Sequence, residues 1–277
     1  LILKQAEKLN SHPGESVDVA DIAGRICARD VTAPMPNQPF DNSAMDGYAV
    51  RADDLAGAGA DTPVTLRLLN EIAAGDHKAE NYYKPGSCLA IMTGAPVPDG
   101  WDAVVPVENT SKDGSDIRFF TSPKAGDNIR LEGEDIQKSD PLVRARTKLS
   151  HLHILPLTTV GISQVEVFKR PKVGLIPTGK EIISDLRQTL APGQIYNSNG
   201  PYLKAEIEKT GAQALALAPI PDDPEMFESE LEKALSNKTD IIISTGAVSA
   251  GAYDFIPDIL NKRGAEIFFH KAQIRPG

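Results

Sequence analysis

The second half of the chain, from residue 171 onward, alternates short apolar runs with amphipathic segments, and this alternation limits the folds available to it. Each apolar run is long enough for a buried strand and too short for a helix of ordinary length. The expected strands lie at residues 172–179, 212–220, 239–246 and 265–274, and the expected helices at 197–211, 222–235 and 254–264. Alternation of this kind is typical of a three-layer α/β domain with a parallel sheet.

The two longer expected helices carry their own start and stop signals. In the segment 197–211, Leu203 and Ile207 share one face, and Gly211 is placed to end the helix. The segment 222–235 begins with an aspartate cap and a proline in its first turn. Its predicted apolar stripe consists of Phe227, Leu231 and Leu235.

Upstream of this region the composition and hydrophobic pattern of the sequence change twice. Residues 32–131 contain short apolar runs separated by Gly, Pro and Asp, which predicts a β-rich inserted domain. The flanking residues 1–31 and 132–162 are expected to form one discontinuous linker domain with helical character. The α/β domain then occupies residues 163–277. The predicted fold class is therefore α/β plus β.

Charge and composition exclude several classes of function. The formal net charge of the 277 residues is −9, which argues against a nucleic-acid or membrane-surface binder. No apolar run approaches the length of a bilayer span, and charges interrupt the N-terminal segment where a signal peptide would have its core. The two cysteines form no CxxC pair, so we expect a reducing, cytoplasmic environment. The chain begins without Met and ends on "IRPG", so we expect it to be part of a longer protein.

Two of the expected strands end in a Thr-Gly turn that is followed by an acid. In parallel α/β sheets, ligands bind beyond the carboxyl ends of the strands. Small residues there allow backbone N–H groups to approach a phosphate, and a divalent cation such as Mg²⁺ explains nearby acids. The alternative is that each turn is a plain strand-to-helix connection, but two equivalent turns favour a site. Its candidate residues are Thr178, Gly179 and Glu181 at the first turn, and Thr245, Gly246, Ser249, Gly251 and Asp254 at the second.

Three further segments are richer in polar and turn-forming residues than their surroundings require. The stretch "PFDNSAMDGYAV" at 39–50 suits neither a helix nor a strand. The turn containing Thr93 and the acidic segment "EGEDI" at 132–136 are each ambiguous when taken alone, because such segments are usually solvated loops. Cys27 and Cys88 are expected to be packing residues.

Taken together, these segments resemble the molybdopterin molybdenumtransferase family, which comprises the MoeA proteins and the C-terminal part of gephyrin. The stretch at 39–50 is similar to the family's hallmark. In family order there follow "IMTGAPVPDGWDAVVPVE", "NIRLEGEDI", "GLIPTGKEI", "GQIYNSN", "DDP", "STGAVSAGAYD" and "KAQIRPG". The likeness extends over essentially the whole chain.

The resemblance implies a MogA-like α/β domain and an elongated homodimer. It also implies a reaction in which adenylylated molybdopterin meets molybdate, molybdenum is inserted, the pyrophosphate link is cleaved and AMP leaves. Mg²⁺ or another divalent cation assists, and the adenylylating enzyme of the same pathway is a possible partner. In the implied dimer, the β-rich domain of one subunit faces the α/β domain of the other.

The family's functional residues map onto this chain motif by motif. The resemblance assigns catalytic roles to Asp46, Asp135, Glu181 and Asp254. It assigns metal binding to Glu181, Asp222 and Asp254. Substrate binding is assigned to Thr93, Thr178, Gly179, Asp222, Thr245, Gly246, Ser249, Gly251, Lys271 and Arg275.

Three positions depart from the family pattern: Lys180, Ala247 and Arg275. Lys180 and Ala247, together with the expectation that the chain is part of a longer protein, favour an alternative function, namely a paralogue that binds pterin or serves as a scaffold without turnover. A third possible function is catalysis of the preceding step, the adenylylation of molybdopterin. That function would need only the α/β domain, and the hallmark at 39–50 argues against it. The set of five acids, at 46, 135, 181, 222 and 254, favours the enzyme.

Overall fold

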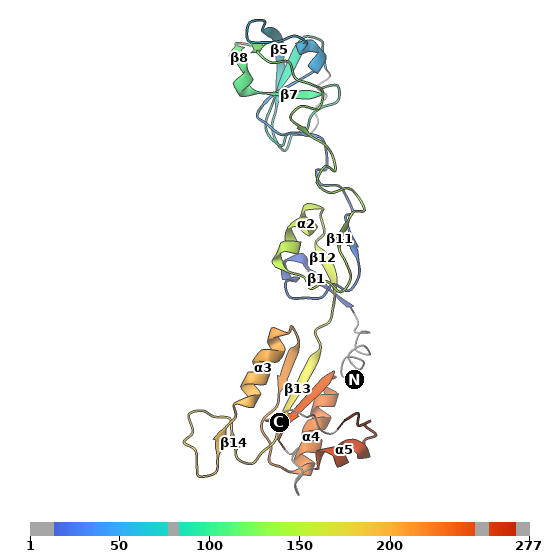
Figure 1. Ribbon diagram of the computed structural model, residues 1–277, viewed down its shortest axis with the longest axis vertical. Helices are drawn as coiled ribbons and strands as arrows, with labels where there is room; N and C mark the ends of the chain where they lie inside the picture. Colours follow the sequence, from blue (N-terminus) through green and yellow to red (C-terminus); the bar gives the residue numbers. More distant parts are fainter. Residues whose placement is uncertain (1–13, 77–82, 247–254, 270–277) are drawn as a thin grey trace.

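The computed structural model describes residues 14–76, 83–246 and 255–269, and they form three parts arranged along the longest axis of the molecule (Figure 1). The β-rich part lies at one end, the α/β part at the other, and a small β-containing part lies between them. The chain passes through the middle part twice, once before the β-rich part and once after it.

A mixed six-stranded sheet forms the β-rich part. Its strands follow the order β7-β4-β6-β5-β9-β8, and all neighbours are antiparallel except β5 and β6. The strands are β4 (Gly47–Val50), β5 (Val64–Ile72), β6 (Ser87–Ile91), β7 (Ala103–Pro106), β8 (Thr110–Asp113) and β9 (Asp116–Phe119). Tyr48 and Phe119 meet edge to face in one core, with ring centroids 5.8 Å apart, and Trp101 is buried in a second. The predicted β character of this region is confirmed.

The middle part is built from segments that are far apart in the sequence. Strand β1 (Gly14–Asp18) pairs antiparallel with β12 (Gln164–Phe168), and β2 (Val31–Thr32) pairs with β11 (Pro141–Val143). The only helical elements here are the 3-10 turns Val19–Asp21 and His151–His153 and the short helix α2 (Ile154–Thr159), within the described residues. A buried cluster that includes Ile22, Cys27, Leu149 and Leu157 holds these pieces together.

The pairing of β12 with β1 places residues 164–168 in the middle part rather than in the α/β part, where the sequence pattern alone had put them. Within 132–162, where helical character was expected, helical structure is confined to residues 151–159, and residues 141–143 pair with β2 instead. In both cases a partner strand more than 100 residues away decides the conformation, and local periodicity carries no information about it.

The α/β part has a parallel sheet of three strands in the order β16-β13-β17, which confirms the predicted parallel pairing. The strands are β13 (Lys172–Pro177), β16 (Gln213–Ala216) and β17 (Ile241–Thr245), and the helices are α3 (Asn199–Lys209), α4 (Pro224–Ser236) and α5 (Ile256–Lys262). In Figure 1 the sheet lies between α3 on one side and α4 with α5 on the other. A small parallel pair, β14 (Ile182–Ile183) and β15 (Ile195–Tyr196), extends from the edge of this part.

Two details of the α/β part differ from the sequence-based expectation. Leu235, predicted in the apolar stripe of α4, is 48% exposed, and Ala234 is fully buried in its place. In the turn of α4 that follows Leu231, the residue three positions on, Ala234, faces the core. The residue four positions on, Leu235, faces away from it. The strand expected at 265–274 is absent from its described portion, residues 265–269, and the rest of it lies outside the described residues.

None of the helices within the described ranges is both long and apolar enough to cross a bilayer.

Candidate functional site

The expectation that the stretch at 39–50 suits no strand is wrong, because residues 42–43 and 47–50 form strands that pair with distant segments. The turn between these two strands presents Asp46 to solvent. Strand β3 (Asn42–Ser43) pairs with β10 (Ile129–Arg130), and after the turn the chain enters β4 in the six-stranded sheet. Gly47 is required at the start of β4, because a Cβ atom there would lie 2.1 Å from the carbonyl oxygen of Val105. The glycine of this stretch is therefore explained by a close backbone contact.

Asp46 is held by the turn that follows β6. Its Oδ1 accepts hydrogen bonds from the backbone N–H and the hydroxyl of Thr93, both at 2.8 Å. The two bonds from Thr93, the backbone bond first, lower the pKa of the Asp46 carboxyl below its usual value. The structure thus brings together two residues that the sequence placed in separate motifs, and it keeps the carboxylate ionised.

Asp135 belongs to a second polar cluster, next to the end of β10 and the segment before the hallmark stretch. Its Oδ2 accepts hydrogen bonds from Arg130 at 2.8 Å, from Gln38 at 3.2 Å and from Asn37 at 3.4 Å. The Gln38 side chain in turn accepts a bond from the buried Asn42, at 2.9 Å. Asp135 is therefore linked to the hallmark stretch through one amide side chain.

Three members of this cluster are not among the residues predicted from the sequence: Asn37, Gln38 and Arg130. Arg130 lies within the quoted motif "NIRLEGEDI", five residues before Asp135, but a spacing of five gives no reason to expect contact in a loop. Asn37 and Gln38 lie in the Pro-rich segment immediately before the hallmark stretch. No local signal identifies them.

At the other end of the molecule, Thr178 and Gly246 meet at the carboxyl edge of the parallel sheet. The backbone N–H of Thr178 donates to the carbonyl of Thr245 at 2.7 Å, and its hydroxyl donates to the same oxygen at 3.1 Å. Gly246 has φ +90°, and a Cβ atom on it would lie 2.2 Å from the carbonyl oxygen of Thr178. The two Thr-Gly turns are thus adjacent, as the parallel arrangement predicts.

Glu181 and Asp222 are the acids at this edge within the described residues. The Glu181 carboxylate folds over Gly179, where an added Cβ atom would be 2.8 Å from its Oε1. Asp222 follows Ile220, whose carbonyl accepts a hydrogen bond from the N–H of Gly179 at 2.9 Å. The Oδ1 atom of Asp222 is buried and has no hydrogen-bond partner among the described residues.

A buried carboxylate oxygen without a partner is costly, and a bound cation is one way of satisfying it. Carboxylate oxygens are also the donors that Mg²⁺ prefers. Asp222 therefore offers one donor atom that suits the expected cation. No group of three potential metal ligands occurs within the part of the chain that the structure describes, so Glu181 and Asp222 form an incomplete set there. Lys180, next to Glu181, is exposed.

Several predicted site residues lie outside the described residues. They are Ser249, Gly251, Asp254, Lys271 and Arg275, together with the departure at Ala247.

The two cysteines are packed in the interior, as expected. Both are buried, Cys27 in the middle part and Cys88 in the β-rich part. Burial raises the pKa of the Cys88 thiol to about 12, so its nucleophilic thiolate is scarce at neutral pH.

The candidate residues thus form two groups at opposite ends of the molecule. Asp46, Thr93 and Asp135 belong to the β-rich part, whereas Thr178, Gly179, Glu181, Asp222, Thr245 and Gly246 belong to the α/β part. The middle part separates them along the long axis (Figure 1). Within one chain the structure does not bring the two groups together.

Two family models match this chain, one over the β-rich and middle parts and one over the α/β part. Residues 1–161 match the family described as "MoeA N-terminal region (domain I and II)", and residues 174–277 match "Probable molybdopterin binding domain". The chain belongs to the MoeA family.

Its MoeA-family relatives include proteins named molybdopterin molybdenumtransferase from Synechococcus elongatus, 37% identical over 95% of this chain, and from Bacillus subtilis, 38% identical over 95%. These matches cover 65% and 61% of the relatives, so the chain spans somewhat less than two thirds of their length. A crystal structure of a molybdopterin biosynthesis MoeA protein from Pyrococcus horikosii superposes with a TM-score of 0.81 at 32% identity, covering 94% of this chain and 66% of that one.

Proposed function

We propose that this protein inserts molybdenum from molybdate into adenylylated molybdopterin, with cleavage of the pyrophosphate link and release of AMP. Family membership supports the substrate class, because the relatives carry the name molybdopterin molybdenumtransferase. The observation that carries the proposal is the unsatisfied Oδ1 of Asp222 beside the two adjoining Thr-Gly turns. Such turns suit phosphate oxygens, and an unpaired carboxylate suits the cation that accompanies them.

A single site that contains both groups of candidate residues requires a second copy of the chain. The acid held by Thr93 and the acids at the sheet edge lie in different parts of one chain, with the middle part between them (Figure 1). A homodimer in which the β-rich part of one subunit covers the sheet edge of the other would unite them. A closed two-fold pair produces two such sites.

The roles of the residues follow from their chemistry. Water attacks one phosphorus of the pyrophosphate link, a new P–O bond forms, and the bridging P–O bond breaks, so that AMP leaves and a phosphate stays on the pterin. A carboxylate accepts the proton of the attacking water. Asp46 is the weaker candidate for this step because its pKa is lowered, so it is better suited to orienting a donor.

The sheet edge supplies the binding groups. Glu181 and Asp222, with Asp254, would hold Mg²⁺, which when bound neutralises phosphate charge. Thr178, Thr245, Ser249 and the amides of Gly179, Gly246 and Gly251 would donate hydrogen bonds to phosphate or pterin, and Lys271 and Arg275 would bind the anionic groups. This part would act as a three-layer, MogA-like domain. The substrate would come from the adenylylating enzyme in a reducing cytoplasm.

The test is AMP release by the full-length protein. Adenylylated molybdopterin, Mg²⁺ and molybdate are mixed with the protein, and AMP is followed by chromatography. We expect molybdate-dependent AMP, and we expect Asp46→Asn, Asp135→Asn and Glu181→Gln each to lower its rate by roughly 10²-fold or more, because each removes a charge from the reacting region. Asp113→Asn, on the exposed β8–β9 hairpin, is the matched control and should leave the rate unchanged.

Other outcomes would contradict the proposal. Tight binding of the substrate without AMP would indicate a pterin-binding protein that does not turn over. Equal rates in the three site variants and in Asp113→Asn would show that the assigned acids take no part in the reaction.

A further inference from the structure

A cavity of about 330 Å³ lies where the middle part meets the α/β part, away from both groups of candidate site residues. The end of β12 and residues 24–26 form one wall, and the turn after α3, residues 210–212, forms the other. The two walls approach closely, since a Cβ atom on Gly211 would lie 3.5 Å from the carbonyl oxygen of Gly24. The volume is at the lower end of the range for small-molecule sites, which is roughly 300–1,000 Å³.

The lining is cationic in a chain whose net charge is −9. Arg25, Arg146, Lys169 and Arg170 line the cavity, and no carboxylate does so among the described residues. Arg25 is engaged, because its guanidinium pairs with Glu15 and donates to the carbonyl of Phe168 at 3.0 Å. That bond ties Arg25 to the backbone at Phe168, so Arg25 is not the cation that faces a ligand.

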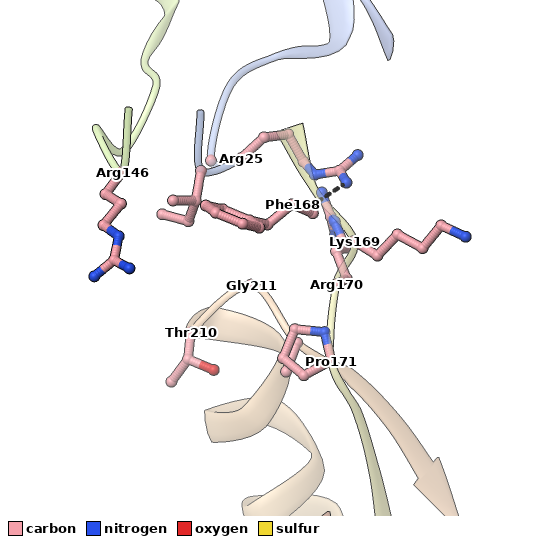
Figure 2. A pocket seen from close by; sticks show the side chains of 11 residues that line it. Arg25, Arg146, Phe168, Lys169, Arg170, Pro171, Thr210 and Gly211 are labelled. Carbon is pink, nitrogen blue, oxygen red and sulfur yellow. Dashed lines mark hydrogen bonds between the residues drawn. The ribbon is translucent and has the colours of Figure 1, made fainter. Parts of the chain in front are cut away.

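Arg146 is the cation best placed to face a ligand. In Figure 2 the ring of Phe168 points towards the side of the cavity where Arg146 lies, whereas Lys169 extends away from both. Arg146 has no salt-bridge partner among the described residues. Its backbone lies in the left-handed region, at φ +67°, and its N–H donates to the carbonyl of Cys27 at 2.7 Å. Glycine would adopt this conformation without strain, so the arginine side chain is present at a conformational cost.

The ring and the guanidinium specify the kind of ligand. The face of Phe168 offers a stacking surface for a planar apolar body, and a guanidinium binds carboxylate or phosphate through two parallel hydrogen bonds. From these contacts we infer that the junction cavity is a second binding site, which takes a small planar organic anion: an aromatic or heteroaromatic ring bearing a phosphate or carboxylate.

The location gives such a ligand a structural consequence. It would contact Phe168 and Arg146 of the middle part and Thr210 and Gly211 of the α/β part at the same time. Binding would therefore favour one angle between the two parts over others.

Isothermal titration of the full-length protein with phenyl phosphate at low ionic strength tests this inference. We expect saturable binding with one site of this kind per chain. Inorganic phosphate, which lacks the ring, and phenol, which lacks the charge, should each bind at least about tenfold more weakly, because each loses one of the two contacts. Benzoate should bind comparably to phenyl phosphate.

Three variants locate the site. Arg146→Gln should weaken phenyl phosphate binding about tenfold or more, since a charge-assisted pair is lost. Arg144→Gln, two residues away, exposed and outside the cavity lining, is the matched control and should bind as the parent does. Phe168→Leu should weaken phenyl phosphate but leave inorganic phosphate unchanged. Absence of saturable binding at millimolar phenyl phosphate, or equal affinity in Arg146→Gln and Arg144→Gln, would overturn the inference. Both of these results concern phenyl phosphate binding alone, so they can be obtained whether or not the protein releases AMP.

Discussion

At the scale of single residues, the contact between Asp46 and Thr93 shows how the molecule sets the charge of a candidate site group. Both hydrogen bonds to Oδ1 come from one residue of a turn whose sequence position is 47 residues away. An exposed aspartate elsewhere on the surface would exchange its partners with water. Here the turn after β6 supplies two donors at once, and the ionised form is favoured.

This arrangement predicts the effect of replacing Thr93. Thr93→Val removes the hydroxyl donor and keeps the backbone donor, so the pKa of Asp46 should rise towards its ordinary value without reaching it. Because the folded-state pKa is lowered, the contact stabilises the fold above the unfolded pKa of Asp46 and is lost as pH falls through the folded value. The variant should therefore lose less stability on acidification.

Titration of the Asp46 carboxyl carbon by NMR measures this change. Thr65→Val, on an exposed position of β5, is the control and should leave the Asp46 titration in place. If Thr93→Val and Thr65→Val gave the same midpoint, the hydroxyl would have no influence on the Asp46 charge.

At the scale of elements, helix α4 illustrates a segment whose start is encoded locally. Asp223 is the N-cap, its Oδ1 accepts the backbone N–H of Met226 at 2.9 Å, and Pro224 occupies the first turn. The helix then buries Phe227, Leu231 and Ala234 against the sheet. Capping and burial act on different residues, so they can be separated by mutation.

Removal of the cap should destabilise the α/β part. We expect Asp223→Ala to lower the free energy of unfolding by about 1 kcal/mol, because the N–H of Met226 loses its acceptor. Asp223→Asn retains an acceptor oxygen and should cost much less. Urea denaturation followed by circular dichroism compares the two. Equal losses for Ala and Asn would mean that the hydrogen bond contributes nothing and that the charge alone matters.

At the scale of the whole molecule, the elongated arrangement separates the two groups of candidate residues (Figure 1). The middle part that separates them is held by β1 with β12 and by β2 with β11, all of them pairs between distant segments. An enzyme that needs both groups must therefore obtain one of them from a partner subunit. This requirement can be tested without knowledge of the dimer interface.

Subunit mixing provides the test of a shared site. Asp46→Asn and Glu181→Gln chains, each impaired alone, are unfolded together and refolded at equal amounts. Half of the random dimers are then mixed and hold one intact site of two, so AMP release should recover to roughly a quarter of the parent rate. A mixture of Asp46→Asn with Asp135→Asn, both in the β-rich part, should not recover. Activity no higher than the sum of the separate variants in the first mixture would contradict a site formed between subunits.

Local patterns in the sequence determined the helices α3, α4 and α5, the three parallel strands, the cap at Asp223 and the meeting of the two Thr-Gly turns. Each of these depends on periodicity or on neighbours a few residues away, or follows directly from parallel pairing. The motifs also determined the family.

Only the tertiary structure decided the features that depend on contacts between distant segments. It showed that β12 pairs with β1 and that Ala234, not Leu235, is buried in the core. It also showed that Asp135 accepts hydrogen bonds from Gln38 and Arg130. It also left Asp222 Oδ1 without a partner among the described residues and formed a cationic cavity from residues near 25, 146, 168 and 210. The physical reason is the same in each case. The energy of such a contact depends on where two distant parts of the chain meet, and no pattern within either part records that position.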